Sequence, residues 1–329
     1  MFIKSMLLLS LLNPFSSGEQ LPSIESQLYK ADDVLHVESC FAHERASYDG
    51  FVSYSVNEFK ASGGKAFSSL TDEIFKERFK AGFYEKFKRN IDCYLIQYQS
   101  EGAVVDGYLV TEKDNNEVLP LVIHNRGGNG EYGKSTILSM LSHMPLLKEG
   151  AIVMGSQYRA KDEFGGADVK DVHALIEIGK SLASVKKDDI NMIGVSRGGM
   201  MSYLVAKQRD DIKKLVIQAG MSDLALSMRE RPGFKAVYEA RIPNYSESPN
   251  VALHARSAIN WVDEINERVE ILLLHGDADK RVDVKNASNM ASKLASLNRK
   301  HKLVIYPGGG HSLKKEKRKV NKEISNWLF

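Results

Sequence analysis

A serine flanked by glycines is the first feature of the chain that could do chemistry. The run Gly194-Val195-Ser196-Arg197-Gly198 fits the pattern G-x-S-x-G; an apolar stretch, Ile190–Gly194, enters it and a helical pattern, Gly198–Arg209, follows it. In that strand-turn-helix context the turn holds the serine in a strained backbone conformation, and the glycines let neighbouring backbone approach. The pattern predicts that Ser196 is a nucleophile.

A serine hydroxyl is a poor nucleophile at neutral pH, so it needs a general base that a carboxylate orients. Downstream, one apolar run leads into a segment with the acids Asp277, Asp279 and Asp283, and the next leads into a glycine-rich loop with His311. The carboxyl ends of parallel strands meet at one edge of a sheet, and the order serine, acid, histidine is that of α/β-hydrolases. We therefore predict that His311 is the base, and that His275 has a structural role.

Acyl transfer also needs donors for the developing oxyanion. The backbone N–H of Arg197 directly follows the nucleophile and is the expected first donor. For the second we propose Arg126, through its backbone or its guanidinium, from the run His124-Asn125-Arg126-Gly127-Gly128. Arg126 has two alternative roles, binding of a substrate carboxylate or a surface ion pair.

The elements that must position these residues read as a mostly parallel sheet with helices on both faces, an α/β-hydrolase fold. The expected strands are Cys93–Gln99, Val104–Val110, Leu119–His124, Ala151–Gly155, Ile190–Gly194, Leu215–Gln218, Ile271–His275 and Leu303–Tyr306. The expected helices are Ser135–Lys148, Asp168–Ser181, Gly198–Arg209, Val284–Leu297 and Leu313–Leu328. Residues 91–329 would form this catalytic domain, with a small helical insertion at about 223–260, where three of the eight prolines lie.

The N-terminal part has a different character. Residues 1–18 carry Lys4, an apolar run and then small residues, which predicts a signal peptide and an exported, periplasmic or secreted protein without stable membrane insertion. Residues 19–90 read as a helical extension, in which apolar side chains from Leu70 to Phe87 recur on one helical face. Cys40 and Cys93 are the two cysteines; they either form a disulfide or are buried free thiols.

Taken together, these segments resemble the prolyl oligopeptidase family of serine peptidases, known as S9, from about residue 91 to the C-terminus. The family's acid loop, H-G-x-x-D-x-x-V, falls on His275-Gly276, Asp279 and Val282, and the segment from Tyr158-Arg159 to Asp171 is similar too. The resemblance implies cleavage of peptide bonds through an acyl-enzyme, without a cofactor. It also selects Asp279 as the acid of the triad.

The chain departs from the pattern of the family, whose members typically carry a large β-propeller before the catalytic domain, whereas about seventy residues precede it here. The restriction to short peptides therefore does not carry over, and a carboxylesterase with the same triad is the alternative. The substrate is expected to be a small peptide or an ester.

A rival motif lies in the Arg126 loop, because residues 128–135 formally fit the phosphate-binding pattern G-x-x-x-x-G-K-S. A P-loop nucleotide-binding protein is thus a remote alternative, which leaves the serine, acid and histidine loops unexplained. A catalytically inactive binding module is a third, against which the ordered triad argues. The 45 basic and 42 acidic residues are interspersed, so the sequence predicts no nucleic-acid partner, and no spacing typical of metal ligands occurs.

Overall fold

A computed structural model describes residues 20–329, so the expected signal peptide lies outside the described residues. Nine strands form one sheet in the order β1-β2-β3-β5-β4-β6-β7-β8-β9. The first three pairings, β1–β2, β2–β3 and β3–β5, are antiparallel, and all later ones are parallel. The strands are β1 Val34–Ser39, β2 Ile91–Ser100, β3 Ala103–Glu112, β4 Leu119–Asn125, β5 Ile152–Ser156, β6 Val185–Val195, β7 Ile212–Gln218, β8 Glu270–Gly276 and β9 His301–Tyr306.

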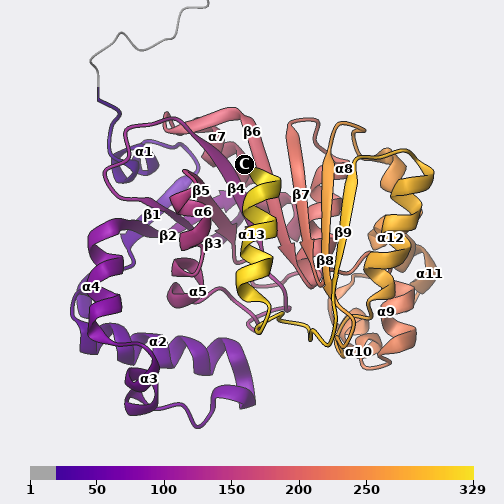
Figure 1. Ribbon diagram of the computed structural model, residues 1–329, viewed down its shortest axis with the longest axis horizontal. Helices are drawn as coiled ribbons and strands as arrows, with labels where there is room; N and C mark the ends of the chain where they lie inside the picture. Colours follow the sequence, from indigo (N-terminus) through magenta and orange to yellow (C-terminus); the bar gives the residue numbers. More distant parts are fainter. Residues whose placement is uncertain (1–19) are drawn as a thin grey trace, which may run out of the picture.

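Helices cover both faces of this sheet (Figure 1). One face packs against α7 (Asp168–Ser181), α8 (Arg197–Lys207) and α12 (Lys285–Ser296). The other packs against α5 (Ile137–Leu141), α6 (Met144–Lys148) and α13 (Lys317–Leu328). Successive residues of β4 serve the two cores in turn: Leu121 and Ile123 belong to the first and Val122 to the second. This alternation, with both sides apolar, is what a sheet covered on two faces requires, and the expected α/β-hydrolase architecture is confirmed.

The N-terminal segment differs from the expected all-helical extension. It contains α1 (Ile24–Tyr29), then the edge strand β1, then α2 (Tyr48–Gly63), α3 (Asp72–Arg78) and α4 (Ala81–Asn90). The aromatic stripe therefore spans two helices: the chain is extended at Phe79, where α3 ends, and at Lys80, which begins α4. Cys40 and Cys93 form a disulfide, with their Cα atoms 5.3 Å apart, which ties the residue after β1 to β2.

The expected insertion is indeed built of helices, α9 (Leu224–Glu230), α10 (Phe234–Arg241) and α11 (Pro249–Arg256). The stretch expected as one helix, Ser135–Lys148, is the pair α5 and α6, because Pro145 in the first turn of α6 starts a new helix. Within residues 20–329 no helix combines the length and apolar character needed to span a membrane.

Candidate active site

Ser196 sits at the tip of the turn between β6 and α8, in a backbone conformation that side-chain-bearing residues rarely adopt. Its φ is 58° and its ψ is −122°. The turn is held because Ser196 N donates to Gln218 O at 3.0 Å, while Ser196 O accepts from Met221 N at 3.1 Å. A Cβ on Gly198 would lie 1.9 Å from Asn125 O, so this glycine is needed for the close approach of β4 to the turn. Such strain, held by its surroundings, is typical of functional residues.

Asp279 and His311 meet at the same sheet edge, from the loops that follow β8 and β9. His311 Nδ1 lies 2.7 Å from Asp279 Oδ2, and the carboxylate of Asp279 is buried. The other carboxylate oxygen, Oδ1, accepts the backbone N–H groups of Arg281 and Val282 at 2.8 and 3.1 Å. Asp279 is thus fully hydrogen-bonded and aimed at the histidine.

The pKa of Asp279 lies far below its usual value, although burial alone would raise it. Hydrogen bonds from His275 and His311, and the charge that His311 can carry, more than offset the burial. His275 Nε2 lies 3.3 Å from Asp279 Oδ2 and 2.9 Å from Val282 O, so it braces the acid loop from the interior. This is the structural position that the sequence suggested for it.

The other two acids of the acid loop do other work. Asp277 accepts the N–H of Gly308 at 2.7 Å, which holds the loop before His311. Asp283 accepts the N–H of Lys285 at 2.8 Å, at the start of α12. Neither has His311 as a hydrogen-bond partner, which leaves Asp279 as the acid placed on the histidine.

Ser196 and His311 line one cavity of about 760 Å³, which we call the active-site cavity. Part of its wall comes from the N-terminal segment, with Phe59 on α2 and Phe67 just after it, and part from the insertion, with Phe234 and Val237 on α10. These apolar side chains can bury an apolar group of a substrate beside the nucleophile. Sequence analysis did not identify Phe59 and Phe67 as site residues, because nothing in their spacing tells which distant loop they face.

The guanidinium of Arg126 is not available to a substrate, so that part of the oxyanion prediction is wrong. It is buried and donates to four carbonyls, those of Gly127, Gly130, Tyr132 and Gln157, at 2.6–3.4 Å. Burial also lowers the pKa of Arg126 to about 10. Its role is to shape the loop after β4.

Gly127, one residue further, is the better placed group. A Cβ on Gly127 would lie 3.1 Å from Ser196 Cβ and 3.1 Å from Val195 O, so its backbone passes directly over the nucleophile. Arg197 N, the other expected donor, belongs to the first residue of α8, where an N–H has no partner within the helix. The glycines after Arg126 were the signal in the sequence that pointed to this position.

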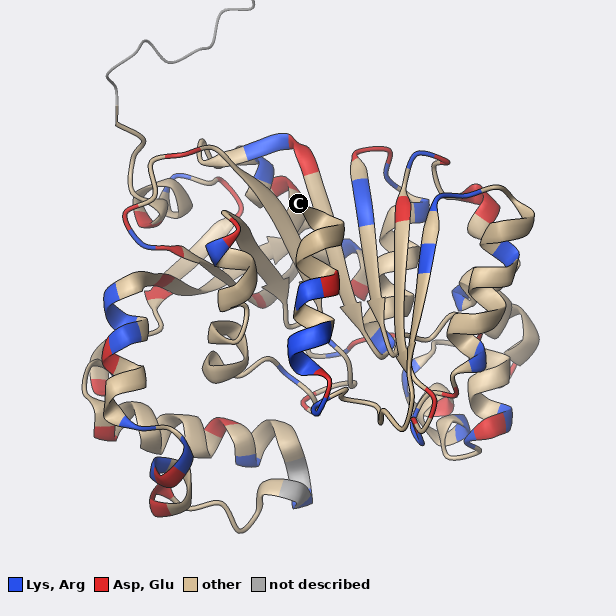
Figure 2. Cartoon of the chain, viewed as in Figure 1, with Lys and Arg blue, Asp and Glu red and all other residues tan. Residues whose placement is uncertain are grey.

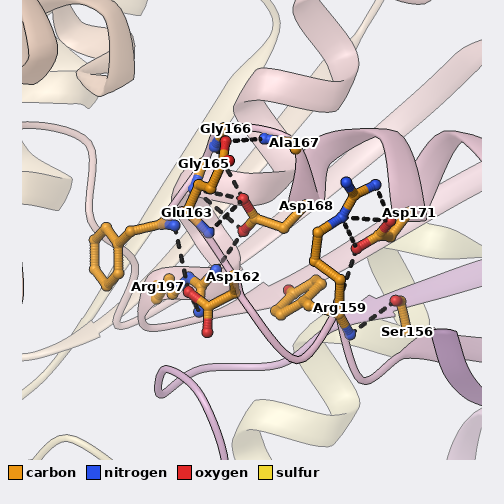
Figure 3. Close-up of polar contacts among 12 residues, drawn as sticks. Ser156, Arg159, Asp162, Glu163, Gly165, Gly166, Ala167, Asp168, Asp171 and Arg197 are labelled. Carbon is orange, nitrogen blue, oxygen red and sulfur yellow. Dashed lines mark hydrogen bonds and ion pairs between the residues drawn. The ribbon is translucent and has the colours of Figure 1, made fainter. Parts of the chain in front are cut away.

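The side chain of Arg197, the residue after Ser196, is held by a cluster of buried acids (Figure 3). Its guanidinium pairs with the buried carboxylates of Asp162, at 3.1 Å, and Asp168, and it donates to Gly128 O at 3.0 Å. Asp168 in turn accepts the N–H groups of Glu163, Gly165 and Gly166. Nearby, Arg159 forms a bidentate pair with Asp171. The segment from Tyr158 to Asp171, which resembles the S9 family, therefore holds Arg197, the residue after Ser196.

The phosphate-binding reading of residues 128–135 does not fit this geometry. A phosphate cradle needs free backbone N–H groups, but here Asp162 accepts that of Gly130, Ser62 O that of Gly133 and Gln157 Oε1 that of Ser135. Lys134 pairs with Glu131 at 2.9 Å. The helix that follows the motif, α5, has its N-cap at Thr136, is capped by that side chain and spans only five residues.

The model of the prolyl oligopeptidase family matches residues 149–329, more than half of the chain. The chain belongs to the prolyl oligopeptidase family. This family consists of serine peptidases, and the chain is a serine-type hydrolase of this kind.

Individual relatives of the family are distant. The chain is 24% identical over 251 residues to the uncharacterized peptidase YtmA of Bacillus subtilis, covering 73% of this chain and 94% of that one. It is 23% identical to the uncharacterized peptidase YuxL of the same organism, covering 77% of this chain and 42% of that one. Among solved structures, an acylaminoacyl peptidase with a bound chloromethyl ketone superposes with a TM-score of 0.62 at 20% identity, covering 73% and 42%. The chain thus spans nearly all of YtmA and less than half of the other two.

Proposed function

We propose that the chain hydrolyses peptide bonds through Ser196, His311 and Asp279. The observation that carries the proposal is that His311, whose Nδ1 lies 2.7 Å from Asp279 Oδ2, lines the same cavity as the strained Ser196. His311 takes the hydroxyl proton as Ser196 Oγ attacks the substrate carbonyl carbon, and Asp279 stabilises the imidazolium that forms. The N–H groups of Arg197 and Gly127 hold the oxyanion.

The attack gives a tetrahedral intermediate, and the collapse of this intermediate breaks the C–N bond of the peptide. His311 gives its proton to the departing amine, and the acyl group stays on Ser196 Oγ. A water molecule then attacks the acyl-enzyme while His311 accepts its proton; the bond between the acyl carbon and Ser196 Oγ breaks, His311 returns the proton to Oγ, and the acid departs. Each step uses groups of this chain and water.

The lining of the active-site cavity indicates the kind of substrate. Its charged residues are Lys134, Arg197, Arg231 and Arg281, all basic, and no Asp or Glu of the described residues lines it. Its apolar wall includes Phe59, Phe67 and Phe234. We therefore propose a peptide with an apolar side chain at the cleaved bond and no requirement for a free amino group there.

We also propose that the protein is exported. The disulfide between Cys40 and Cys93 suits an oxidising compartment, and the sequence of residues 1–18 has the pattern of a signal peptide.

A fluorophosphonate probe tests the mechanism: we expect labelling of the wild type and none of Ser196→Ala. Ser202→Ala is the matched control, because Ser202 is a buried serine of α8, away from the cavity. A panel of N-blocked aminoacyl p-nitroanilides and p-nitrophenyl esters then separates peptidase from carboxylesterase. Turnover of esters alone would favour the carboxylesterase, and labelling that persists in Ser196→Ala would overturn the mechanism.

A further inference from the structure

A second cavity, of about 360 Å³, lies directly behind the catalytic turn, between the sheet, α6 and α13; we call it the α13 cavity. Val195 lines both cavities, and Ser312, the residue after His311, lines the α13 cavity. The α13 cavity therefore adjoins the nucleophile on one side and the loop of the base on another.

The mouth of the α13 cavity is basic. Lys314 and Lys317 line it and form no ion pair within the described residues. Figure 2 shows Lys and Arg gathered on the first turns of α13, and no side chain caps that end of the helix. No Asp or Glu of residues 20–329 lines the cavity. Uncompensated ammonium groups at a helix N-terminus attract an anion.

Two histidines inside the α13 cavity add a hydrogen-bond donor. Tyr108 Oη lies 2.9 Å from His124 Nδ1 and 3.2 Å from His143 Nε2. Burial lowers the pKa of both imidazoles, that of His124 to about 4, so both are neutral near pH 7. When Tyr108 donates its single proton to one of them, the other nitrogen of that ring carries the hydrogen. That N–H has no protein acceptor within the described residues and can bind an anion.

The remaining lining of the cavity is mainly apolar. Leu146, Leu313, Val320 and Ile324 are buried side chains that border it. A cavity with an apolar floor, a basic mouth and a neutral N–H donor suits a carboxylate attached to an apolar body.

We propose that the α13 cavity binds the C-terminal residue of the leaving peptide, with its α-carboxylate on Lys314 and Lys317. This inference rests on the proposed function, because His311 must protonate the leaving amine. The leaving segment therefore lies against the His311 loop, which continues through residues 312–317 into the wall of this cavity. The enzyme then prefers short peptides whose free C-terminus, on an apolar residue, lies close to the cleaved bond.

The test compares three substrates that share one N-blocked acyl part. The first has a short leaving peptide that ends in leucine with a free carboxylate, the second is its C-terminal amide, and the third is the p-nitroanilide, which has no leaving peptide. Mass spectrometry identifies the cleaved bond. We expect kcat/KM at least tenfold higher for the acid than for the amide.

The double variant Lys314→Ala/Lys317→Ala is expected to lower kcat/KM for the acid about tenfold and to leave the amide and the anilide within twofold. The matched control is Lys315→Ala/Lys319→Ala, which removes the same charge from the same segment but from residues outside the cavity lining. We expect this control to retain the preference for the acid. Thermal melting of both variants verifies that they fold.

Equal rates of the wild type on acid and amide, with the anilide still cleaved, would overturn this inference and leave the proposed function intact. A preference that the control loses as fully as the double variant would also overturn it, because general surface charge would then explain the effect. Hexanoate supplies the same chemistry from a free ligand: inhibition competitive with the acid peptide supports the inference, and noncompetitive modulation would reassign the cavity to an effector. Absence of both probe labelling and cleavage of all three substrates would instead refute the proposed function.

Discussion

Arg197 offers the sharpest test of how the catalytic turn is held. Its guanidinium is 2% exposed, and the carboxylates of Asp162 and Asp168 that it pairs with are 0% exposed. Arg197→Met keeps most of the side-chain length and removes the charge, so two buried carboxylates lose their shared partner. Breaking a buried ion pair by removing one member costs about 3–5 kcal/mol of the free energy of unfolding at neutral pH.

The pH dependence of this loss gives an independent test. In the wild type, burial acts to raise the pKa of Asp162, but Arg197 and two backbone N–H groups outweigh it and the pKa is lowered. Without Arg197, we expect burial to prevail and the folded-state pKa to rise above the unfolded value of about 3.9. An acid with a raised folded pKa destabilises the fold increasingly as the pH rises above its unfolded pKa. The gap between variant and wild type should therefore be smaller at pH 5 than at pH 8.

Urea unfolding followed by circular dichroism at both pH values measures this gap. Arg159→Met is the matched control: it also removes a guanidinium, but one that is 16% exposed and has the single acidic partner Asp171. We expect the control to lose less stability than Arg197→Met. A loss below about 1 kcal/mol for Arg197→Met, or an equal gap at pH 5 and pH 8, would refute the view that this ion cluster holds the turn.

Three further changes follow from the structure. Asp279→Asn should lower kcat/KM by roughly 10⁴-fold; because the folded pKa of Asp279 is lowered, its stability cost should be full at pH 7 and shrink on acidification below about pH 4, which urea titrations can follow. Gly127→Ala should cost about 10²-fold in kcat, since the added Cβ crowds Ser196 and displaces the Gly127 N–H from the oxyanion, and an unaltered kcat would refute the close approach of this backbone to Ser196. Cys40→Ala/Cys93→Ala removes a link across 53 residues, worth about 4 kcal/mol, so calorimetry should find Tm lower by about 6 °C, and an unchanged Tm would refute a stabilising role of the disulfide.

The elements of the fold that could be predicted are those marked by a local pattern in the sequence, such as an apolar run or a helical periodicity. All eight expected strands are present, and the central parallel ones, such as β4, β5 and β8, are apolar runs buried on both faces of the sheet. Strand β1 was missed because it is an edge strand with polar residues, His36 and Glu38, within six residues, and its pairing with β2 spans more than fifty residues of chain. Phe79 was placed inside a helix because periodicity records spacing and not the break between α3 and α4.

In the candidate site, too, some features could be predicted from the sequence and others could not. Ser196, Asp279 and His311 were predicted from topology, because each follows a strand that ends at the same edge of the sheet; the pairing of His311 with Asp279 is confirmed, and the catalytic role of the three stays a prediction. The guanidinium of Arg126 was wrongly predicted to be an oxyanion donor. It donates instead to the carbonyls of Gly130 and Gln157, and no local sequence pattern reveals these contacts. Side-chain contacts between loops belong to the tertiary structure.

The N-terminal segment has the position from which substrate access can be controlled. It places Phe59 and Phe67 in the wall of the active-site cavity, which Ser196 also lines. Several links hold it there, among them the disulfide between Cys40 and Cys93, the hydrogen bond from Ile137 N to Glu58 Oε2 at 3.0 Å and that from Gly133 N to Ser62 O at 2.9 Å. A wall held in place by these links can select the side chains in the acyl part of a peptide substrate. The α13 cavity, as proposed above, would bind the leaving part. Specificity on the acyl side would then arise from this segment, which packs on the sheet and supplies part of the cavity wall.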